Sequence, residues 1–167
     1  QASLADFTPL IVPRHPQRFA EIAGLAQQAG WQVLRRVDFA HTATLPSNTL
    51  LLGDSMGEMA FYYGLSDVAL MGGSFLPYGG QNLIEALACH CPVILGEHTY
   101  NFAEASASAL AQGLARRAAH MPQALALALA ISLNADTPAP AAFSAYLQTQ
   151  QGGIGRTLDS IKIIQSP

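Results

Sequence analysis

The chain has 167 residues, of which 50% are hydrophobic, enough for one substantial core and too few for two ordinary domains. Its net charge of -3 and its scattered arginines argue against a general nucleic-acid-binding surface. No uninterrupted apolar run approaches the roughly 20 residues of a membrane span, so we expect a soluble fragment. Because it begins Gln1-Ala2-Ser3, with neither an initiator methionine nor a signal segment, we expect a single domain from a longer polypeptide.

Short β-branched or leucine-rich runs alternate with helical patterns along the whole chain. This alternation predicts the α/β class, with a parallel sheet flanked by helices. A polar segment at 38–48, broken by Pro46, is predicted to be a loop. Strands are expected at residues 10–13, 31–35, 49–52, 68–71, 93–95 and 116–118. Helices are expected at residues 16–28, 56–63, 83–90, 102–112 and 121–133, followed by a break at Pro138 and Pro140 and two final helices.

The two cysteines, Cys89 and Cys91, flank His90 at the end of a predicted helix. A structural zinc site normally draws on two separated cysteine or histidine pairs, and no second cysteine pair exists in the sequence. We therefore interpret both cysteines as small buried hydrophobes and predict no metal site.

The segment GGSFLPYGGQNLIE, residues 72–85, follows one predicted strand and precedes a predicted helix. In open α/β sheets, ligands bind at this carboxyl edge of the strands. Glycine there allows the backbone to approach a ligand, and amides at a helix start can face an anion. Gly79, Gly80 and Gln81 are therefore accessory candidates for binding a nucleotide phosphate or a sugar carboxylate.

Three predicted strand-to-helix junctions place a capping residue three positions before a glutamate, which is the spacing of a capping box. For Glu104 we expect capping alone. Glu58 and Glu85 each follow a strand and a glycine-containing turn, so either carboxylate could also accept hydrogen bonds from ribose hydroxyls. The junctions are Ser55-Met56-Gly57-Glu58, Asn82-Leu83-Ile84-Glu85 and Asn101-Phe102-Ala103-Glu104.

Arg14 lies directly after the first predicted strand, between Pro13 and Pro16. The two prolines stiffen this turn, and a guanidinium suits a phosphate or a carboxylate through paired donors. The alternative is a solvated surface arginine. His15 and His98 lie on predicted edge loops, where each could donate to an anion, act as an acid or base, or be an ordinary polar residue.

Five segments, in order along the chain, resemble the C-terminal half of Kdo transferases, which attach 3-deoxy-D-manno-octulosonic acid (Kdo) to a lipid A precursor. The resemblance lies in VPRHPQRF at 12–19, LGDSMGEMAFYY at 52–63, DVALMGGSF at 67–75, GGQNLIEALA at 79–88 and PVILGEHTYNFAE at 92–104.

The resemblance implies a Rossmann-like donor domain, the C-terminal half of a GT-B glycosyltransferase, that binds CMP-Kdo without a cofactor. It implies that Pro13 and Arg14 meet the CMP, that Met56, Gly57 and Glu58 form a second contact, and that Asn82, Leu83, Ile84 and Glu85 form a third, with Glu85 on the ribose. The catalytic base and the site for the lipid A precursor would lie in an N-terminal domain outside this sequence. The whole enzyme would act at the cytoplasmic side of the bacterial inner membrane, and the fragment alone would be inactive.

Two positions depart from the family pattern. Gln81 stands where histidine is usual, which removes a titratable group, and Ala86 stands where many members have proline. Two alternatives stay open: a GT-B transferase that uses a UDP or GDP sugar, and a non-catalytic nucleotide-binding or interaction domain.

Overall fold

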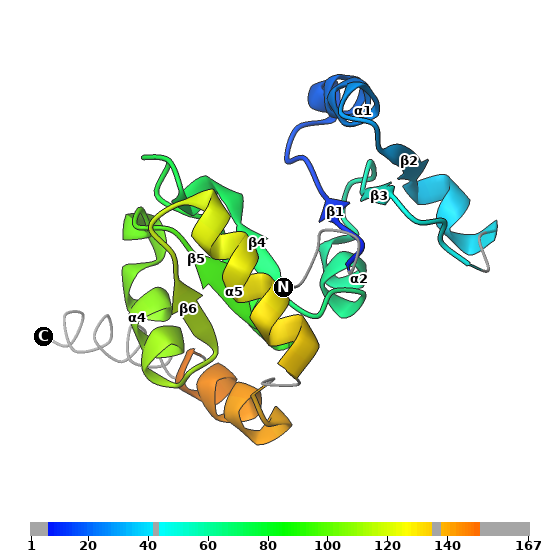
Figure 1. Ribbon diagram of the computed structural model, residues 1–167. Coiled ribbons are helices and arrows are strands. Elements are labelled where there is room, and N and C mark those ends of the chain that lie inside the picture. The colour runs from blue at the N-terminus through cyan, green and yellow to red at the C-terminus, as the bar shows by residue number, and fades with distance from the viewer. Residues whose placement is uncertain (1–6, 42–43, 135–137, 151–167) are drawn as a thin grey trace, which may run out of the picture. The chain divides into compact units, whose positions relative to one another are not determined.

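The computed structural model describes residues 7–41, 44–134 and 138–150, and the chain divides into two compact units (Figure 1). The first unit ends at Ser66 and the second begins at Asp67. Each unit contains a three-stranded parallel sheet with helices packed beside it. The predicted α/β class is therefore confirmed, with the described strands divided between two sheets.

The first unit has the strand order β1-β3-β2. Register pairs Ile11 with Leu52 and Arg35 with Leu52, so all three strands end at the same edge. Its elements are β1 (Leu10–Ile11), the 3-10 helix η2 (Pro16–Arg18), α1 (Phe19–Gln28), β2 (Gln32–Arg35), the 3-10 helix η3 (Arg36–His41), β3 (Thr49–Leu52) and α2 (Met59–Gly64).

The core of the first unit forms between α1 and the sheet. Buried alanines of α1 contact buried leucines of β3, because small side chains on one helical face allow close approach to the strand. Trp31, the sole tryptophan of the chain, packs against this cluster. The buried members are Ala23, Ala26, Leu50 and Leu52.

The second unit has the strand order β4-β5-β6. The central strand β5 is buried at all three positions, as expected for a parallel strand covered on both faces. Its elements are β4 (Ala69–Met71), the 3-10 helix η4 (Gly72–Ser74), α3 (Leu83–Ala88), β5 (Val93–Leu95), the 3-10 helix η5 (Tyr100–Phe102), α4 (Ala103–Ala111), β6 (Ala115–Arg117), α5 (Met121–Asn134) and a helix over residues 140–150.

Several boundaries differ from the sequence predictions for local reasons. The predicted helix at 56–63 starts later, at Met59, because Gly57 adopts a φ of +78°. The predicted helix at 83–90 stops at Ala88, and His90 has a φ of +58°. Part of the predicted loop at 38–48 is instead the 3-10 helix η3. The last predicted helix falls outside the described residues.

Tyr146, in the helix over residues 140–150, makes the second unit less stable at alkaline pH. Its side chain is buried, and its hydroxyl donates to the Ala105 carbonyl at 3.2 Å. Burial raises the pKa of Tyr146 to about 12. The pKa of Tyr146 is therefore higher in the folded chain than in the unfolded chain. The protonated Tyr146 side chain contributes fully to the stability of the fold below the unfolded pKa of about 10, and this contribution to stability is lost as pH rises toward 12.

We expect Tyr146→Phe to lower the free energy of unfolding by about 1 kcal/mol at neutral pH, through loss of the hydrogen bond. The variant should also lose stability less steeply than the parent chain above pH 10 or so. Urea denaturation at a series of pH values would measure both effects. Identical alkaline slopes in the two proteins would contradict the prediction.

Candidate functional site

The predicted site residues of the first unit follow the ends of adjacent parallel strands. Val12 to His15 follow β1, and Ser55 to Glu58 come shortly after β3. Gly53 holds the two segments together, since its N–H donates to Ile11 O at 2.9 Å and a Cβ atom there would lie 2.8 Å from Val12 Cγ2. The sequence prediction that these two segments share one edge agrees with this arrangement.

Arg14 is exposed in the turn after β1. Among the described residues, it forms no ion pair. His15 is also exposed and extended, with φ -117° and ψ 124°, as expected before Pro16. Pro13 is half-buried. The turn therefore presents the Arg14 and His15 side chains to solvent, while their roles in binding remain a prediction.

The turn after β3 differs from the predicted capping box. The Ser55 hydroxyl donates to the Glu58 carboxylate instead of capping a helix, and α2 begins only after Glu58. The prediction of a capping box at Ser55 is therefore wrong, because the hydroxyl is already engaged by a side chain. Met56 and Gly57 lie at the exposed tip of this turn.

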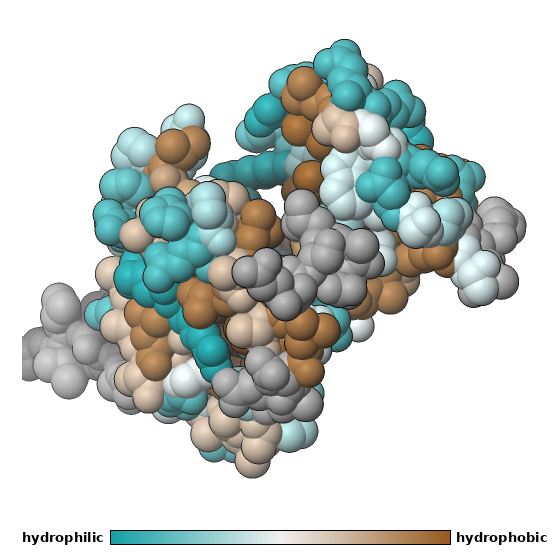
Figure 2. Space-filling view, viewed as in Figure 1, coloured by the Kyte–Doolittle hydropathy of each residue, from teal (hydrophilic) through white to brown (hydrophobic). Residues whose placement is uncertain are grey.

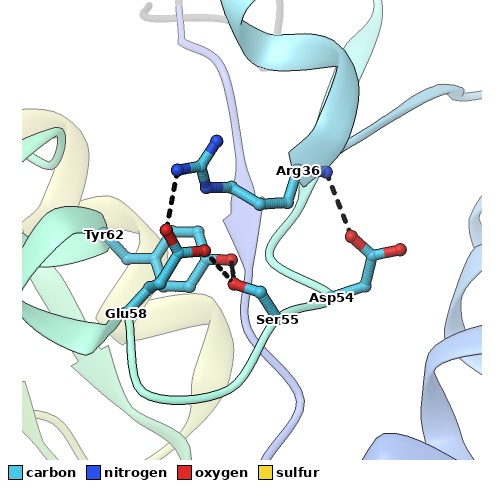
Figure 3. Close-up of polar contacts among 5 residues, drawn as sticks. All are labelled: Arg36, Asp54, Ser55, Glu58 and Tyr62. Carbon is cyan, nitrogen blue, oxygen red and sulfur yellow. Dashed lines mark hydrogen bonds and ion pairs between the residues drawn. The ribbon is translucent and has the colours of Figure 1, made fainter.

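Glu58 is held by donors on both of its carboxylate oxygens (Figure 3). Ser55 donates to Oε2, and Arg36 Nη2 donates to Oε1 at 2.7 Å. The hydrogen bond from Ser55, followed by the one from Arg36, lowers the pKa of Glu58. The carboxylate is thus ionised and fixed in orientation at neutral pH.

Sequence reasoning missed Arg36, which follows β2 at the same edge as Glu58. The two residues are 22 positions apart, so no local pattern joins them. The available signal was topological: Arg36 comes directly after β2, the position that the sequence had predicted for Arg14 relative to the first strand. Its backbone N–H also donates to Asp54 Oδ1 at 3.0 Å, which connects the end of β2 to the turn after β3.

In the second unit, Asn82 caps α3 as predicted. Its side-chain oxygen accepts the Ile84 N–H at 3.1 Å. Glu85 is exposed on the first turn of α3, and Ile84 is half-buried. Leu83 is fully buried in the core, so any ligand contact that it makes would involve its backbone.

The glycine-rich loop before α3 is closed by its own side chains and backbone. Gln81 Oε1 accepts the Gly73 N–H at 3.1 Å, and the Gly80 N–H donates to Gly73 O at 3.3 Å. Gln81 is thus an internal acceptor that fixes the loop.

The same loop is attached to the segment that follows β5. The N–H of His98, a half-buried residue, donates to Ser74 O at 2.9 Å, and the Asn101 N–H donates to Gly79 O at 3.1 Å. Gly79 and Gly80 have φ values of +85° and +89°, and a Cβ atom on Gly79 would lie 2.2 Å from Asn101 Nδ2. Both glycines are therefore required by backbone conformation or close packing.

Asn101 does not form the predicted capping box with Glu104. Its amide donates to Tyr78 O at 3.3 Å, residues 100–102 form η5, and α4 begins at Ala103 without a side-chain cap. The residue that looked like a helix cap instead fixes the tip of the glycine-rich loop.

The structure supports the interpretation of Cys91 as a small buried hydrophobe. Burial raises the pKa of the Cys91 thiol to about 12, while Cys89 is half-buried. In residues 7–41, 44–134 and 138–150, no three His, Cys, Asp or Glu side chains are grouped so as to hold a metal ion. In the same ranges, no helix combines the length and the apolar character needed to cross a bilayer.

No family model matches the chain. The crystal structure of the C-terminal CMP-Kdo binding domain of WaaA from Acinetobacter baumannii superposes with a TM-score of 0.75 and 29% identity, covering 84% of this chain and 74% of that one. The 3-deoxy-D-manno-octulosonic acid transferase of Bordetella pertussis is 46% identical over 92% of this chain. The chain is a homologue of Kdo transferases.

Other Kdo transferases match a shorter part of the chain. The Haemophilus influenzae enzyme is 50% identical over 97 residues, which are 57% of this chain and 22% of its own length. The chain spans 36% of the Bordetella pertussis Kdo transferase. It thus corresponds to about a third or less of the curated Kdo transferases that it matches, and the fold match identifies that part as the C-terminal domain.

Proposed function

We propose that this chain is the donor domain of a Kdo transferase and binds CMP-Kdo. The observation that carries the proposal is the match in fold, over 84% of the chain, to a domain described as binding CMP-Kdo. The identity of 46% to a Kdo transferase over almost the whole chain supports the same donor. We propose further that residues 1–167 act as one Rossmann-like donor domain of the GT-B type, including the helices from about residue 138.

The proposed roles follow the resemblance. In the first unit, Pro13 and Arg14 would meet the CMP, and Met56, Gly57 and Glu58 would form a second contact. In the second unit, Asn82 to Glu85 would form a third, with Glu85 on the ribose. Departure of CMP builds negative charge on its phosphate, so Arg14 and the amides of the turn at 79–82 would stabilise the transition state more than the ground state.

The activity of the whole enzyme is also a proposal. A lipid A precursor would be the acceptor, the catalytic base and the acceptor site would lie in the remainder of the enzyme, and transfer would take place at the cytoplasmic side of the inner membrane. We accordingly expect this chain alone to transfer no Kdo. Turnover by the purified chain would show that the base lies within these residues.

Calorimetric titration with CMP, and with UMP and GMP as competitors, tests the proposed donor. We expect binding selective for CMP, and we expect Arg14→Ala and Glu85→Ala each to weaken it by about tenfold or more, since each removes a charged hydrogen-bond partner. Both side chains are exposed, so the melting temperature should be unchanged.

Arg18→Ala is the matched control for Arg14. Arg18 is exposed nearby and pairs with Glu21 at 3.2 Å, so its loss should leave CMP affinity unaltered. Preference for UMP or GMP would indicate a different sugar donor. Absence of nucleotide binding would favour an interaction domain, and unchanged affinity in both Arg14→Ala and Glu85→Ala would refute the residue assignments.

A further inference from the structure

Arg36 has a fixed position although it belongs to none of the predicted contacts. Its guanidinium carbon lies 4.2 Å from the centre of the Phe61 ring, and its Nη2 donates to Glu58 Oε1 at 2.7 Å. Its backbone N–H is bound by Asp54 at 3.0 Å. Stacking on an aromatic face and pairing with a carboxylate restrict a guanidinium more than either interaction alone.

Glu58 Oε2 accepts the last of two consecutive hydrogen bonds that lead from the buried Tyr62 hydroxyl through the Ser55 hydroxyl. Tyr62 is 1% exposed, and its hydroxyl oxygen lies 2.5 Å from Ser55 Oγ. Because Ser55 has one hydroxyl hydrogen and donates it to Glu58, the proton between the two hydroxyls must come from Tyr62. Glu58 is therefore oriented from the core on one side and by Arg36 on the other (Figure 3).

We propose that Arg36 is a positioning residue of the donor site, which acts by holding the Glu58 carboxylate and, through it, the exposed Met56-Gly57 tip. This inference rests on the proposed function, because it takes the turn at 55–58 to be a donor contact. Arg36 itself need not touch the nucleotide. Its contribution is to remove the freedom that Glu58 would otherwise lose on binding, which strengthens binding without a new ligand contact.

Arg35 offers a matched control in the adjacent position. Arg35 Nη1 pairs with Asp54 Oδ2 at 3.4 Å, so it neighbours the same turn and carries the same charge without contacting Glu58. Arg36→Met removes the charge and keeps an apolar stem beside Phe61. Arg36→Lys restores the charge without the planar guanidinium.

We expect Arg36→Met to weaken CMP binding by about tenfold, and Arg36→Lys to recover part of the loss, because a charge-assisted hydrogen bond orients Glu58. Arg35→Met should stay within about twofold of the parent affinity. In a Glu58→Gln background, Arg36→Met should add less than about twofold, because two residues that act through one contact are not additive.

The pH dependence of CMP binding separates orientation from general damage to the fold. The titratable and charged groups around Glu58 are Arg36 from η3, Tyr62 from α2, and Asp54 with Arg35 at the turn. Loss of Arg36 or of the Ser55 hydroxyl should raise the Glu58 pKa toward its ordinary value. On acidification, Arg36→Met and Ser55→Ala should therefore lose their affinity for CMP at a higher pH than the parent chain does. Arg35→Met should show the same dependence of CMP affinity on pH as the parent chain.

The outcomes are distinguishable. If the parent chain binds no CMP, both the proposed function and this role fail before any variant is made. If the parent binds CMP, and Arg36→Met binds it equally well and loses affinity at the same pH on acidification, the positioning role alone is overturned. A full additional loss from Arg36→Met in the Glu58→Gln background would also overturn it, since Arg36 would then act independently of Glu58. Ser55→Ala repeats the pH test should Arg36→Met fail to fold.

Discussion

Gly96→Ala is expected to destabilise the second unit by about 3 kcal/mol or more, because the new methyl group would overlap backbone atoms. A Cβ atom on Gly96 would lie 2.3 Å from Ser74 O, 2.6 Å from Ser74 C and 2.8 Å from Phe75 Cα. The close approach is fixed by the Gly96 N–H, which donates to Ser74 Oγ at 2.7 Å, and by Arg117 Nη1, which donates to Gly96 O at 2.5 Å. Relief of the overlap would separate the loop after β4 from the end of β5.

Chemical denaturation followed by far-ultraviolet circular dichroism would measure this loss. Gly72→Ala is the matched control, because it lies at the start of the same loop and a Cβ atom there has no neighbour within 4 Å. Its free energy of unfolding should stay within about 0.5 kcal/mol of the parent value. Equal stability of Gly96→Ala and the parent chain would show that the two loops are not packed as described.

Phe143→Ala is expected to lower the free energy of unfolding by about 3–5 kcal/mol, the usual cost of removing a buried aromatic ring. Phe143 is 1% exposed, and its ring centre lies 5.2 Å from that of His90. The helix over residues 140–150 thus contributes to the core of the second unit through Phe143 and Tyr146, which are both buried.

Gln148→Ala provides the control on the same helix, since Gln148 is exposed and its truncation removes no core contact. We expect it to unfold within about 0.5 kcal/mol of the parent chain in urea. A similarly small effect of Phe143→Ala would mean that this helix is not an integral part of the core.

Sequence patterns predicted best the elements whose signals are local. The strands Thr49–Leu52 and Val93–Leu95 occur with the predicted bounds, because each is a short run of β-branched residues and leucine. Asn82 caps its helix as expected, since its side-chain oxygen and the Ile84 N–H that donates to it are only two residues apart. The order of strands within each sheet did not follow from any local pattern.

The wrong or missed predictions of side-chain partners share one physical cause, which is competition for a polar side chain by a partner distant in the sequence or by another side chain. Ser55 was available as a helix cap in the sequence, but Glu58 and Tyr62 occupy its hydroxyl. Asn101 was taken for a cap, but the carbonyl of Tyr78, 23 positions earlier, binds its amide. The ion pair between Arg36 and Glu58 likewise depends on strand order, which brings the ends of β2 and β3 together.

Surface hydropathy offers little guide to the site. Figure 2 shows apolar surface interspersed with hydrophilic surface on both units in that view. Large apolar side chains are exposed in three places: Met56 at the tip after β3, Leu76 and Tyr78 in the glycine-rich loop, and Tyr100 in η5. The candidate site is therefore defined by hydrogen bonds and backbone conformation more than by a continuous apolar patch.

Trp31 is an intrinsic fluorescent probe for the unfolding of the first unit. The sole indole packs against the core of the first unit, whereas Gly96 and Phe143 lie in the second. Its emission therefore follows the melting of the first unit alone, while circular dichroism follows the helices of both. Coincident transitions in Gly96→Ala would show that the two units unfold as one cooperative body, and an emission change that lags behind the loss of ellipticity would show that the second unit can unfold by itself.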